Sequence, residues 1–205
     1  MHIIICNSSV SSDAIKLAAT KLLDGGIIAY PTETFYGLGV KYDNSAALER
    51  LYAIKQRPLA KTLPIIIGWP EQLDILVGDV TEIARVLIRR FWPGPLTLVF
   101  SAKAGLSKYI TCDNKIAIRV PGASFALDLA RSVQFPITAT SANISGKPAA
   151  ANVQMIQEYF NGSLDLIVDS GQAAIDLPST IVDVSGETAL VLREGAIKAS
   201  RIFSG

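Results

Sequence analysis

Apolar residues recur along the chain with two spacings, one typical of amphipathic helices and the other of buried strands. The helical spacing occupies residues 11–24, 44–57, 79–91, 124–132 and 152–160. Short apolar runs of strand length occupy residues 26–30, 63–68, 96–101, 116–120, 137–140, 164–169, 179–184 and 189–193. Helices and strands alternate at first, and strands cluster towards the C-terminus. The pattern therefore predicts an α/β fold in which helices flank a mixed β-sheet.

Local signals predict where the helices begin and end. Ser11 and Ser12 are candidate N-caps of the first helix. Pro58 predicts that the second helix ends just before it, because the residue preceding a proline disfavours the helical conformation. Asp79 followed by Glu82 resembles a capping box at the start of the third helix. The polar segments outside these ends are therefore candidate loops.

Composition indicates one globular domain over residues 1–205. Half of the 205 residues are hydrophobic and 18% are charged, which supports a sizeable core and excludes a disordered or fibrous chain. Neither an internal repeat nor a linker divides the sequence. The longest apolar runs, residues 3–6, 26–30 and 65–67, are far shorter than the roughly 20 residues that span a bilayer, and no basic segment precedes the first. We therefore expect a cytoplasmic protein with no membrane partner.

The scarcity of histidine and cysteine excludes several kinds of site. His2 is the single histidine, so a Ser-His-Asp triad, a Cys-His dyad and a two-histidine metal site are not expected. Cys6 and Cys112 are too few for a disulfide framework or a four-cysteine zinc site. The sequence also lacks both common phosphate loops, Gly-x-Gly-x-x-Gly and Walker A. Its net charge of +1 gives no general attraction to nucleic acid, so only a local basic cluster would provide one.

Residues 31–39, Pro-Thr-Glu-Thr-Phe-Tyr-Gly-Leu-Gly, follow a buried strand and combine hydroxyls, a carboxylate and glycines. Open α/β sheets bind ligands beyond the carboxyl ends of their strands, so this segment is a candidate ligand loop. The alternative is structural, a turn closed by threonine hydroxyls. Residues 178–180, Pro-Ser-Thr, have similar chemistry before a later strand.

Lys55 and Arg57 lie at the end of the second predicted helix, in the sequence Lys-Gln-Arg-Pro. The apolar face of that helix carries Leu48, Leu51 and Tyr52, and Lys55 is the next position on it, so its side chain is expected on the core side. Lysine as a point charge and arginine as a fork suit an anion. Cations near a helix C-terminus can also simply complement the helix dipole. From these residues alone both interpretations stay open.

Residues 138–148 are dense in serine, threonine and asparagine between an apolar strand and a helix. Such loops bring backbone N–H groups and short polar side chains close to phosphate, although a polar turn is the structural alternative. Arg119 and Arg193 lie on apolar strands, where a guanidinium needs an ion pair or an anionic ligand. Together these segments predict a pocket suited to anions, rich in hydroxyls and cations and poor in acid-base side chains.

Six motifs follow one another in a recognisable order, at residues 31–39, 55–58, 92–97, 118–121, 140–146 and 178–183. In this order they resemble the YrdC-like family of threonylcarbamoyl-AMP synthases, and the resemblance covers roughly residues 10–197. It implies a twisted α/β fold around a mixed sheet, with a concave, positively charged cavity. Longer members add a second domain, so a short, single-domain bacterial type is the better comparison. Some longer members also carry a histidine where this chain has Ile65, Ile66 and Ile67.

The resemblance implies an enzyme, an L-threonylcarbamoyladenylate synthase, that joins L-threonine, bicarbonate and ATP into threonylcarbamoyl-AMP and pyrophosphate. A partner transferase would then place the threonylcarbamoyl group on adenosine 37 of tRNA. Whether this protein itself contacts tRNA or double-stranded RNA stays open. Mg²⁺ would be held largely by the ATP phosphates, with no protein ligand assigned to it. Because the carbamate itself attacks the α-phosphate, a pocket without histidine or nucleophile agrees with this chemistry. Catalysis would rest on positioning and charge stabilisation.

Functional residues carry over from the family motifs to matching positions of this sequence. Those implied on ATP are Lys55, Arg57, Ser141, Asn143, Ala149 and Arg193. Those implied on L-threonine are Thr32, Tyr36, Arg119 and Ser179. Lys55 and Arg57 are the residues expected to be catalytic, and Arg119 suits the amino acid carboxylate because that pair is bidentate.

Three other functions stay open at this point. An RNA-binding module of the same fold would hold tRNA or double-stranded RNA in a basic cavity, although near-neutral composition and the lack of interleaved aromatics weigh against it. A carbamoyl transferase of the hydrogenase-maturation type normally belongs to a much longer chain with cysteine-rich fingers. Paralogues without the Lys-x-Arg and Ser-x-Asn residues also exist, but this sequence retains all four.

Overall fold

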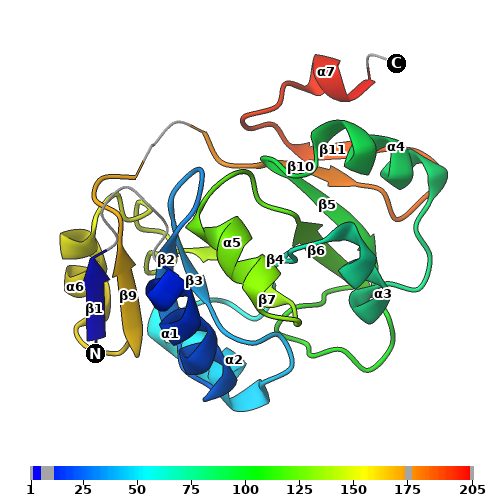
Figure 1. The fold of residues 1–205 in the computed structure, drawn as a ribbon. Coiled ribbons are helices and arrows are strands. Elements are labelled where there is room, and N and C mark those ends of the chain that lie inside the picture. The colour runs from blue at the N-terminus through cyan, green and yellow to red at the C-terminus, as the bar shows by residue number, and fades with distance from the viewer. Residues whose placement is uncertain (1, 6–11, 174–176, 204–205) are drawn as a thin grey trace.

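The computed structural model describes residues 2–5, 12–173 and 177–203, and their strands form two mixed sheets (Figure 1). The first sheet has the order β1-β9-β2-β3-β8. Its strands are β1 (His2–Ile5), β2 (Ile28–Pro31), β3 (Tyr36–Gly39), β8 (Thr140–Ser141) and β9 (Leu166–Asp169). The second sheet has the order β11-β10-β5-β6-β4-β7. Its strands are β4 (Ile65–Ile66), β5 (Leu96–Ser101), β6 (Lys115–Arg119), β7 (Ile137–Thr138), β10 (Thr180–Asp183) and β11 (Leu190–Arg193).

Helices lie between the strands in the chain and cover the sheets. The α-helices are α1 (Ser12–Leu23), α2 (Ser45–Lys55), α3 (Leu73–Leu76), α4 (Glu82–Phe91), α5 (Phe125–Ser132), α6 (Val153–Phe160) and α7 (Ala199–Phe203). A 3₁₀ helix, η1 (Pro70–Gln72), precedes α3. The short elements η1, α3 and α7 were not predicted from the sequence, because segments of three to five residues carry too few positions for a helical period.

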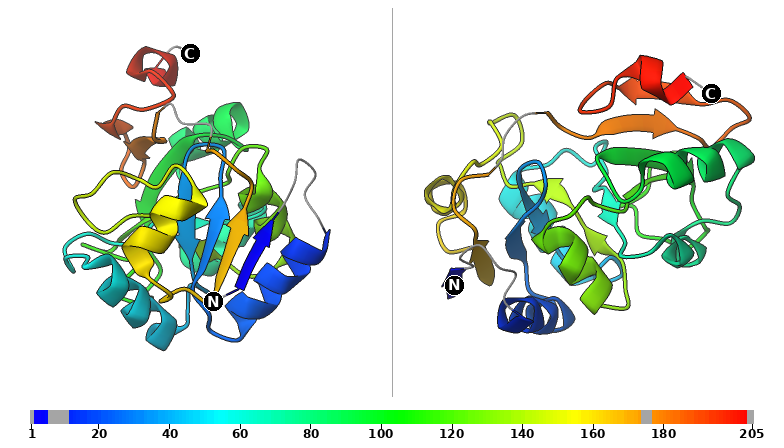
Figure 2. Two further views of the ribbon diagram at one scale, coloured as in Figure 1. Left: turned by 90° about the vertical axis from the view of Figure 1, so that its left-hand side faces the viewer. Right: turned by 45° about the horizontal axis from the view of Figure 1, so that its top comes forward.

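Side-chain alternation along β2 explains why helices cover both faces of the first sheet. Ile28 and Tyr30 pack in one cluster with α1 and α5, whereas Ala29 packs in a second cluster with α2 and α6. Figure 2 shows α1 beside one face of this sheet and α2 and α6 beside the other. The second cluster continues into the second sheet through Leu98 and Ile118. The two sheets are therefore joined by apolar packing.

The prediction of a single mixed sheet was wrong, because the strand predicted over residues 137–140 divides between two sheets. Ile137 and Thr138 pair with β4 in the second sheet, whereas Thr140 and Ser141 pair with β3 in the first. The N–H of Ala139, between them, donates to Pro64 O at 2.8 Å. Apolar periodicity marks an extended segment but does not say with which strand each half pairs.

The predicted helix ends were right in some places and wrong in others. The N-cap of α4 is Thr81, whose side chain accepts the Ala84 N–H at 3.2 Å, so the capping box expected from Asp79 is not formed. Thr81 has the extended backbone that an N-cap requires, directly before the first helical residue. Ser12 is the first residue of α1, and the other candidate cap, residue 11, lies outside the described residues.

Two further segments differ from their predicted form. Residues 36–39, expected in a loop, form β3 and pair antiparallel with β2. The strand expected over residues 63–68 is only β4, Ile65–Ile66. Within the part of the chain that the structure describes, no helix is long and apolar enough to cross a membrane.

Candidate functional site

A cavity of about 570 Å³ is lined by residues from both sheets. Its wall contains three guanidiniums, those of Arg57, Arg119 and Arg193. Threonine and serine hydroxyls from β5, β8 and the segments beside β2 and β10 supply most of the other polar groups. Among the described residues of this wall there is no aspartate or glutamate. The cavity therefore offers cations and hydrogen-bonding groups but no negative charge.

Nine of the ten residues predicted to bind substrate line this one cavity, although they lie far apart in the sequence. They are Thr32, Tyr36, Arg57, Arg119, Ser141, Asn143, Ala149, Ser179 and Arg193. The tenth, Lys55, is not part of the wall. The structure thus brings the predicted site together with one exception.

Lys55 is 1% exposed and lies on the buried face of α2, as its spacing predicted. Its ammonium donates to the backbone oxygens of Ser141 and Asn143, and to Asn143 Oδ1 at 3.3 Å. The Ser145 N–H donates in turn to Lys55 O at 2.8 Å. Burial, helped by the nearby Arg57 charge, lowers the pKa of Lys55 to about 7, while the three oxygens favour its charged form. Lys55 therefore ties the loop that begins at Ser141 to the end of α2, instead of facing the cavity.

The loop from Ser141 to Lys147 is also held by its own side chains. Ser141 Oγ donates to Asn143 Oδ1 at 2.6 Å, and Asn143 Nδ2 donates to Lys147 O. The Ala142 N–H donates to Tyr36 O at 2.8 Å, which joins the loop to β3. These contacts fix the loop before any ligand binds, with Ser141 and Asn143 at the cavity wall.

Arg57 follows a chain reversal at the end of α2. Gln56 has the left-handed conformation, with φ of 49°, and the chain then turns towards Pro58. The Arg57 guanidinium donates from Nε to Lys61 O and from Nη2 to Thr62 O, both at 2.8 Å. Burial lowers the pKa of Arg57, and the nearby Tyr52 hydroxyl only partly offsets this effect. An anionic ligand in the cavity would reverse that penalty.

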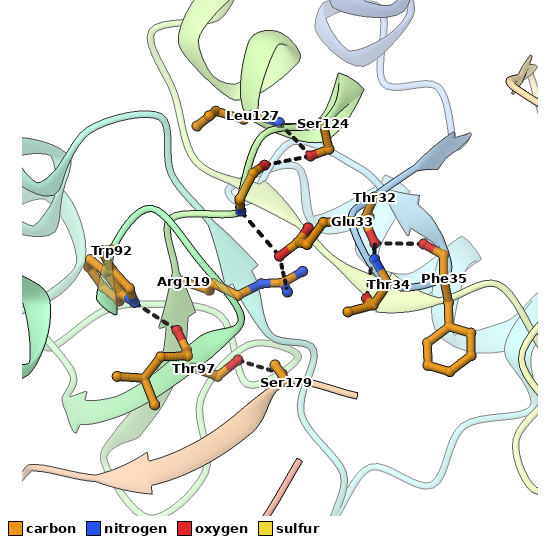
Figure 3. A network of polar contacts seen from close by, with 12 residues as sticks. Thr32, Glu33, Thr34, Phe35, Trp92, Thr97, Arg119, Ser124, Leu127 and Ser179 are labelled. Carbon is orange, nitrogen blue, oxygen red and sulfur yellow. Dashed lines mark hydrogen bonds and ion pairs between the residues drawn. The ribbon is translucent and has the colours of Figure 1, made fainter. Parts of the chain in front are cut away.

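Arg119, at the end of β6, forms an ion pair with Glu33 (Figure 3). Arg119 Nη1 lies 2.7 Å from Glu33 Oε1, and the two side chains are 9% and 16% exposed. The same carboxylate oxygen accepts the Gly122 N–H at 3.2 Å. Arg119 was predicted to need an ion pair or a ligand, and the structure supplies an ion pair while leaving the residue in the cavity wall.

Ser179 lies beside Thr97, on the opposite side of Arg119 from Glu33 (Figure 3). Ser179 Oγ and Thr97 Oγ1 are 2.9 Å apart, and Arg193 Nη2 donates to Ser179 O at 2.8 Å. Burial lowers the pKa of Arg193, and the positive charge of Arg119 lowers it further. Two guanidiniums therefore act on the same region of the cavity.

Thr32 and Tyr36 line the cavity, but their hydroxyls make structural hydrogen bonds. Thr32 Oγ1 donates to Phe35 O at 2.7 Å and accepts the Thr34 N–H at 3.1 Å, which closes the turn between β2 and β3. Tyr36 Oη donates to Gly171 O at 2.7 Å. The interpretation of residues 31–39 as a turn closed by a threonine hydroxyl is therefore confirmed at Thr32. The same segment lines the cavity, and its role as a ligand loop stays a prediction.

Sequence reasoning assigned no role to Glu33, Thr34, Thr97 or Thr140. Glu33 and Thr34 lie within the segment singled out as a ligand loop, so their position was indicated but their contacts were not. Thr97 is 4% exposed on β5, and it ends the motif at residues 92–97, which was the available signal. Among the described residues, no group of three or more histidine, cysteine, aspartate or glutamate side chains forms a metal site.

Two mixed sheets with flanking helices and a shared cavity define an α/β protein with a polar, arginine-lined pocket. A family model named Sua5_yciO_yrdC and described as "Telomere recombination" matches residues 20–195. The chain belongs to this family, as the order of its motifs indicated.

Individual relatives agree with this assignment. The threonylcarbamoyl-AMP synthase of Pyrococcus abyssi is 38% identical over 189 residues, which are 92% of this chain and 56% of that protein. The crystal structure of P. abyssi Sua5 complexed with L-threonine is 36% identical, with a TM-score of 0.93 over 98% of this chain and 60% of that one. The crystal structure of Escherichia coli YciO, 24% identical, matches 98% of both chains with a TM-score of 0.86 and shows the fold alone. The chain spans little more than half the length of the curated relatives that it matches.

Proposed function

We propose that this protein is a threonylcarbamoyl-AMP synthase, which joins L-threonine, bicarbonate and ATP into threonylcarbamoyl-AMP and pyrophosphate. The observation that carries the proposal is the cavity, where three guanidiniums and a fixed polar loop suit a triphosphate beside a carboxylate. The P. abyssi relative has this activity as its name, and the solved P. abyssi Sua5 structure contains L-threonine. The same three arginines in its wall support the expectation of a positively charged cavity.

ATP would bind on the side of the cavity formed by the loop from Ser141 to Ala149. Ser141, Asn143 and Arg57 line the cavity and would contact the phosphates, and Arg193 would approach from the second sheet. Lys55, expected to be catalytic, would act through the loop that it holds rather than by direct contact. Its charge would still favour the bound phosphates from behind the wall.

L-Threonine would bind on the side that contains Arg119. A guanidinium pairs with an amino acid carboxylate through two parallel hydrogen bonds. Ser179 and Thr97 provide adjacent hydroxyls for the polar groups of the amino acid, and Thr32 and Tyr36 close the wall. ATP and threonine would thus meet between two clusters of arginine and hydroxyl groups.

The chemistry requires positioning and charge neutralisation. The threonine amine, after its ammonium proton passes to solvent, adds to the bicarbonate carbon, and loss of water leaves a carbamate. A carbamate oxygen then attacks the α-phosphorus, and the bond to the oxygen bridging the α- and β-phosphates breaks, so that pyrophosphate leaves with the electron pair. Arg57 and Arg193 would offset the charge that develops on the phosphate oxygens. None of these steps needs a protein nucleophile.

Mg²⁺ would be held mainly by phosphate oxygens, because the hydroxyl and amide groups around the cavity offer no cluster of carboxylates among the described residues. When bound, the ion would reduce the negative charge of the phosphates. The product is a mixed anhydride, which a tRNA-modifying transferase would consume in forming N6-threonylcarbamoyladenosine in the cytoplasm.

Pyrophosphate release tests the proposal. The purified protein should release pyrophosphate only when ATP, Mg²⁺, bicarbonate and L-threonine are all present. Arg57→Ala should lower the rate by ~10²-fold or more, because it removes a positive charge that would contact the phosphates. Lys55→Ala should have a similar effect, because it releases the loop that would bind the phosphates. Arg50→Ala is the matched control, because Arg50 is an exposed arginine that pairs with Asp165 on the surface.

Two results would contradict this assignment. Release that does not depend on threonine or bicarbonate would exclude the synthase, and a rate within about threefold of wild type in Arg57→Ala would exclude the role given to Arg57. Salt-dependent binding of double-stranded RNA or tRNA without pyrophosphate release would instead support an RNA-binding module.

A further inference from the structure

The ion pair between Glu33 and Arg119 uses only some of the hydrogen-bond donors and acceptors of the two side chains. One hydrogen bond joins them, from Arg119 Nη1 to Glu33 Oε1 at 2.7 Å. Glu33 Oε2 is buried without a hydrogen-bond partner among the described residues. Within the same residues, no oxygen accepts a hydrogen bond from Nε or Nη2 of Arg119. A guanidinium and a carboxylate usually form two parallel hydrogen bonds, so this single contact leaves the Nε and Nη2 edge of Arg119 available.

We propose that Glu33 is a positioning residue that holds Arg119 with its Nε and Nη2 groups available to the threonine carboxylate. This inference rests on the proposed function of the cavity. Arg119 is a residue of the cavity wall and Glu33 is not, so Glu33 acts through Arg119. A second carboxylate, that of the substrate, would complete the guanidinium by the two-bond contact that Glu33 does not make.

The backbone fixes the Glu33 carboxylate independently of Arg119. The Gly122 N–H donates to Glu33 Oε1 at 3.2 Å. Gly122 O accepts from Ser124 Oγ at 2.8 Å, and Ser124 is the N-cap of α5, accepting the Leu127 N–H (Figure 3). The carboxylate is thus anchored to the start of a buried helix. A guanidinium bound to a fixed carboxylate has fewer accessible rotamers, which lowers the entropy lost when substrate binds.

The charge of Glu33 also matters because two arginines lie on this side of the cavity. Burial lowers the pKa of Arg193, and the positive charge of Arg119 lowers it further, because the two guanidiniums repel each other. Glu33, directly beside Arg119, offsets part of this repulsion. Without that negative charge, Arg119 would be expected to move away from Arg193 and from the position that suits a carboxylate. Attraction of the cavity for phosphate would not fall.

Glu33→Gln tests the proposal because it keeps the shape of the side chain and an oxygen that accepts hydrogen bonds, but removes the charge. Steady-state pyrophosphate release should show the KM for L-threonine raised about tenfold, with the KM for ATP within twofold of wild type. Binding of L-threoninamide, which lacks the carboxylate, should be unchanged between wild type and variant. Glu158→Gln, on the exposed face of α6, is the matched control and should behave as wild type.

A double-mutant cycle shows whether Glu33 acts through Arg119. With Arg119→Lys already present, Glu33→Gln should raise the threonine KM by less than twofold, because the guanidinium that Glu33 positions has been removed. Glu33→Asp, which keeps the charge on a shorter side chain, should recover part of the affinity for L-threonine. It also provides the test if Glu33→Gln does not fold. Equal increases in the KM values of threonine and ATP, or additive effects in the cycle, would overturn the proposal. If wild type neither releases pyrophosphate nor binds L-threonine, the proposed function fails, and this inference fails with it. If wild type is active and Glu33→Gln leaves the threonine KM unchanged, only this inference is refuted.

Discussion

Lys55 carries the most quantitative prediction of the structure. Its ammonium is buried between α2 and the loop that begins at Ser141, and burial together with the Arg57 charge lowers its pKa from 10.5 to about 7. Lys55→Met removes the ionisable group while keeping a side chain of similar length and flexibility. The difference in unfolding free energy between wild type and this variant should therefore depend on pH.

The sign follows from proton binding. Between pH 7 and 10.5 the unfolded chain keeps a proton on Lys55 that the folded chain has released, so folded wild type gains stability as the pH rises through this window. With a limiting slope of about 1.4 kcal/mol per pH unit, the gain integrates to about 2 kcal/mol between pH 7 and pH 9. The variant lacks this contribution. The contributions of all other titrating groups to the unfolding free energy are nearly the same in both proteins, so they largely cancel in the difference.

Urea denaturation at pH 7, 8 and 9 measures this difference directly. The unfolding free energy of wild type minus that of Lys55→Met should rise by about 2 kcal/mol from pH 7 to pH 9. The same comparison with Lys61→Met, an exposed lysine in the following turn, should stay flat. A flat result for Lys55→Met would refute the reasoning, since it would show that the three oxygens around the ammonium outweigh burial and keep Lys55 charged throughout.

Two further predictions concern stability. Tyr36→Phe removes the hydroxyl that donates to Gly171 O, so the unfolding free energy should fall by about 1 kcal/mol, and an unchanged denaturation midpoint would contradict this. Gly195→Ala would place Cβ 2.1 Å from Pro178 O, a backbone atom that cannot rotate away, and should cost ~1–3 kcal/mol in the same assay. Gly186→Ala, where nothing lies within 4 Å of the new Cβ, is its control, and equal destabilisation of both variants would show that the close contact is not the cause.

Local patterns were sufficient for most helices and strands. The buried face of α2 was predicted from its spacing, including the placement of Lys55 among apolar residues. Strands such as β5 and β6 were predicted because continuous apolar runs of that length suit a buried strand. Helix ends were less certain, as at α4, where Thr81 rather than Asp79 is the cap. The capping hydrogen bond depends on the backbone angles of one residue, which the sequence does not specify.

The motifs indicated the site residues, but not how each takes part. Segments 31–39 and 178–180 were both marked as polar and close to strand ends, and both line the cavity. Lys55 was expected beside the phosphates because its family motif lies beside them, whereas its side chain hydrogen-bonds to the loop carbonyls. Spacing gives the direction in which a side chain leaves its helix. The partner that it meets depends on another segment, here 86 residues further along the chain.

By itself, the sequence determined the α/β class, most element positions and the family, because these depend on local periodicity and ordered motifs. Only the tertiary structure decided the division into two sheets, the pairing of Glu33 with Arg119 and the burial of Lys55 behind the loop. These features arise from contacts between segments distant in sequence. A strand or a charged side chain can satisfy its hydrogen bonds with several partners, and the packing of the whole chain selects one of them.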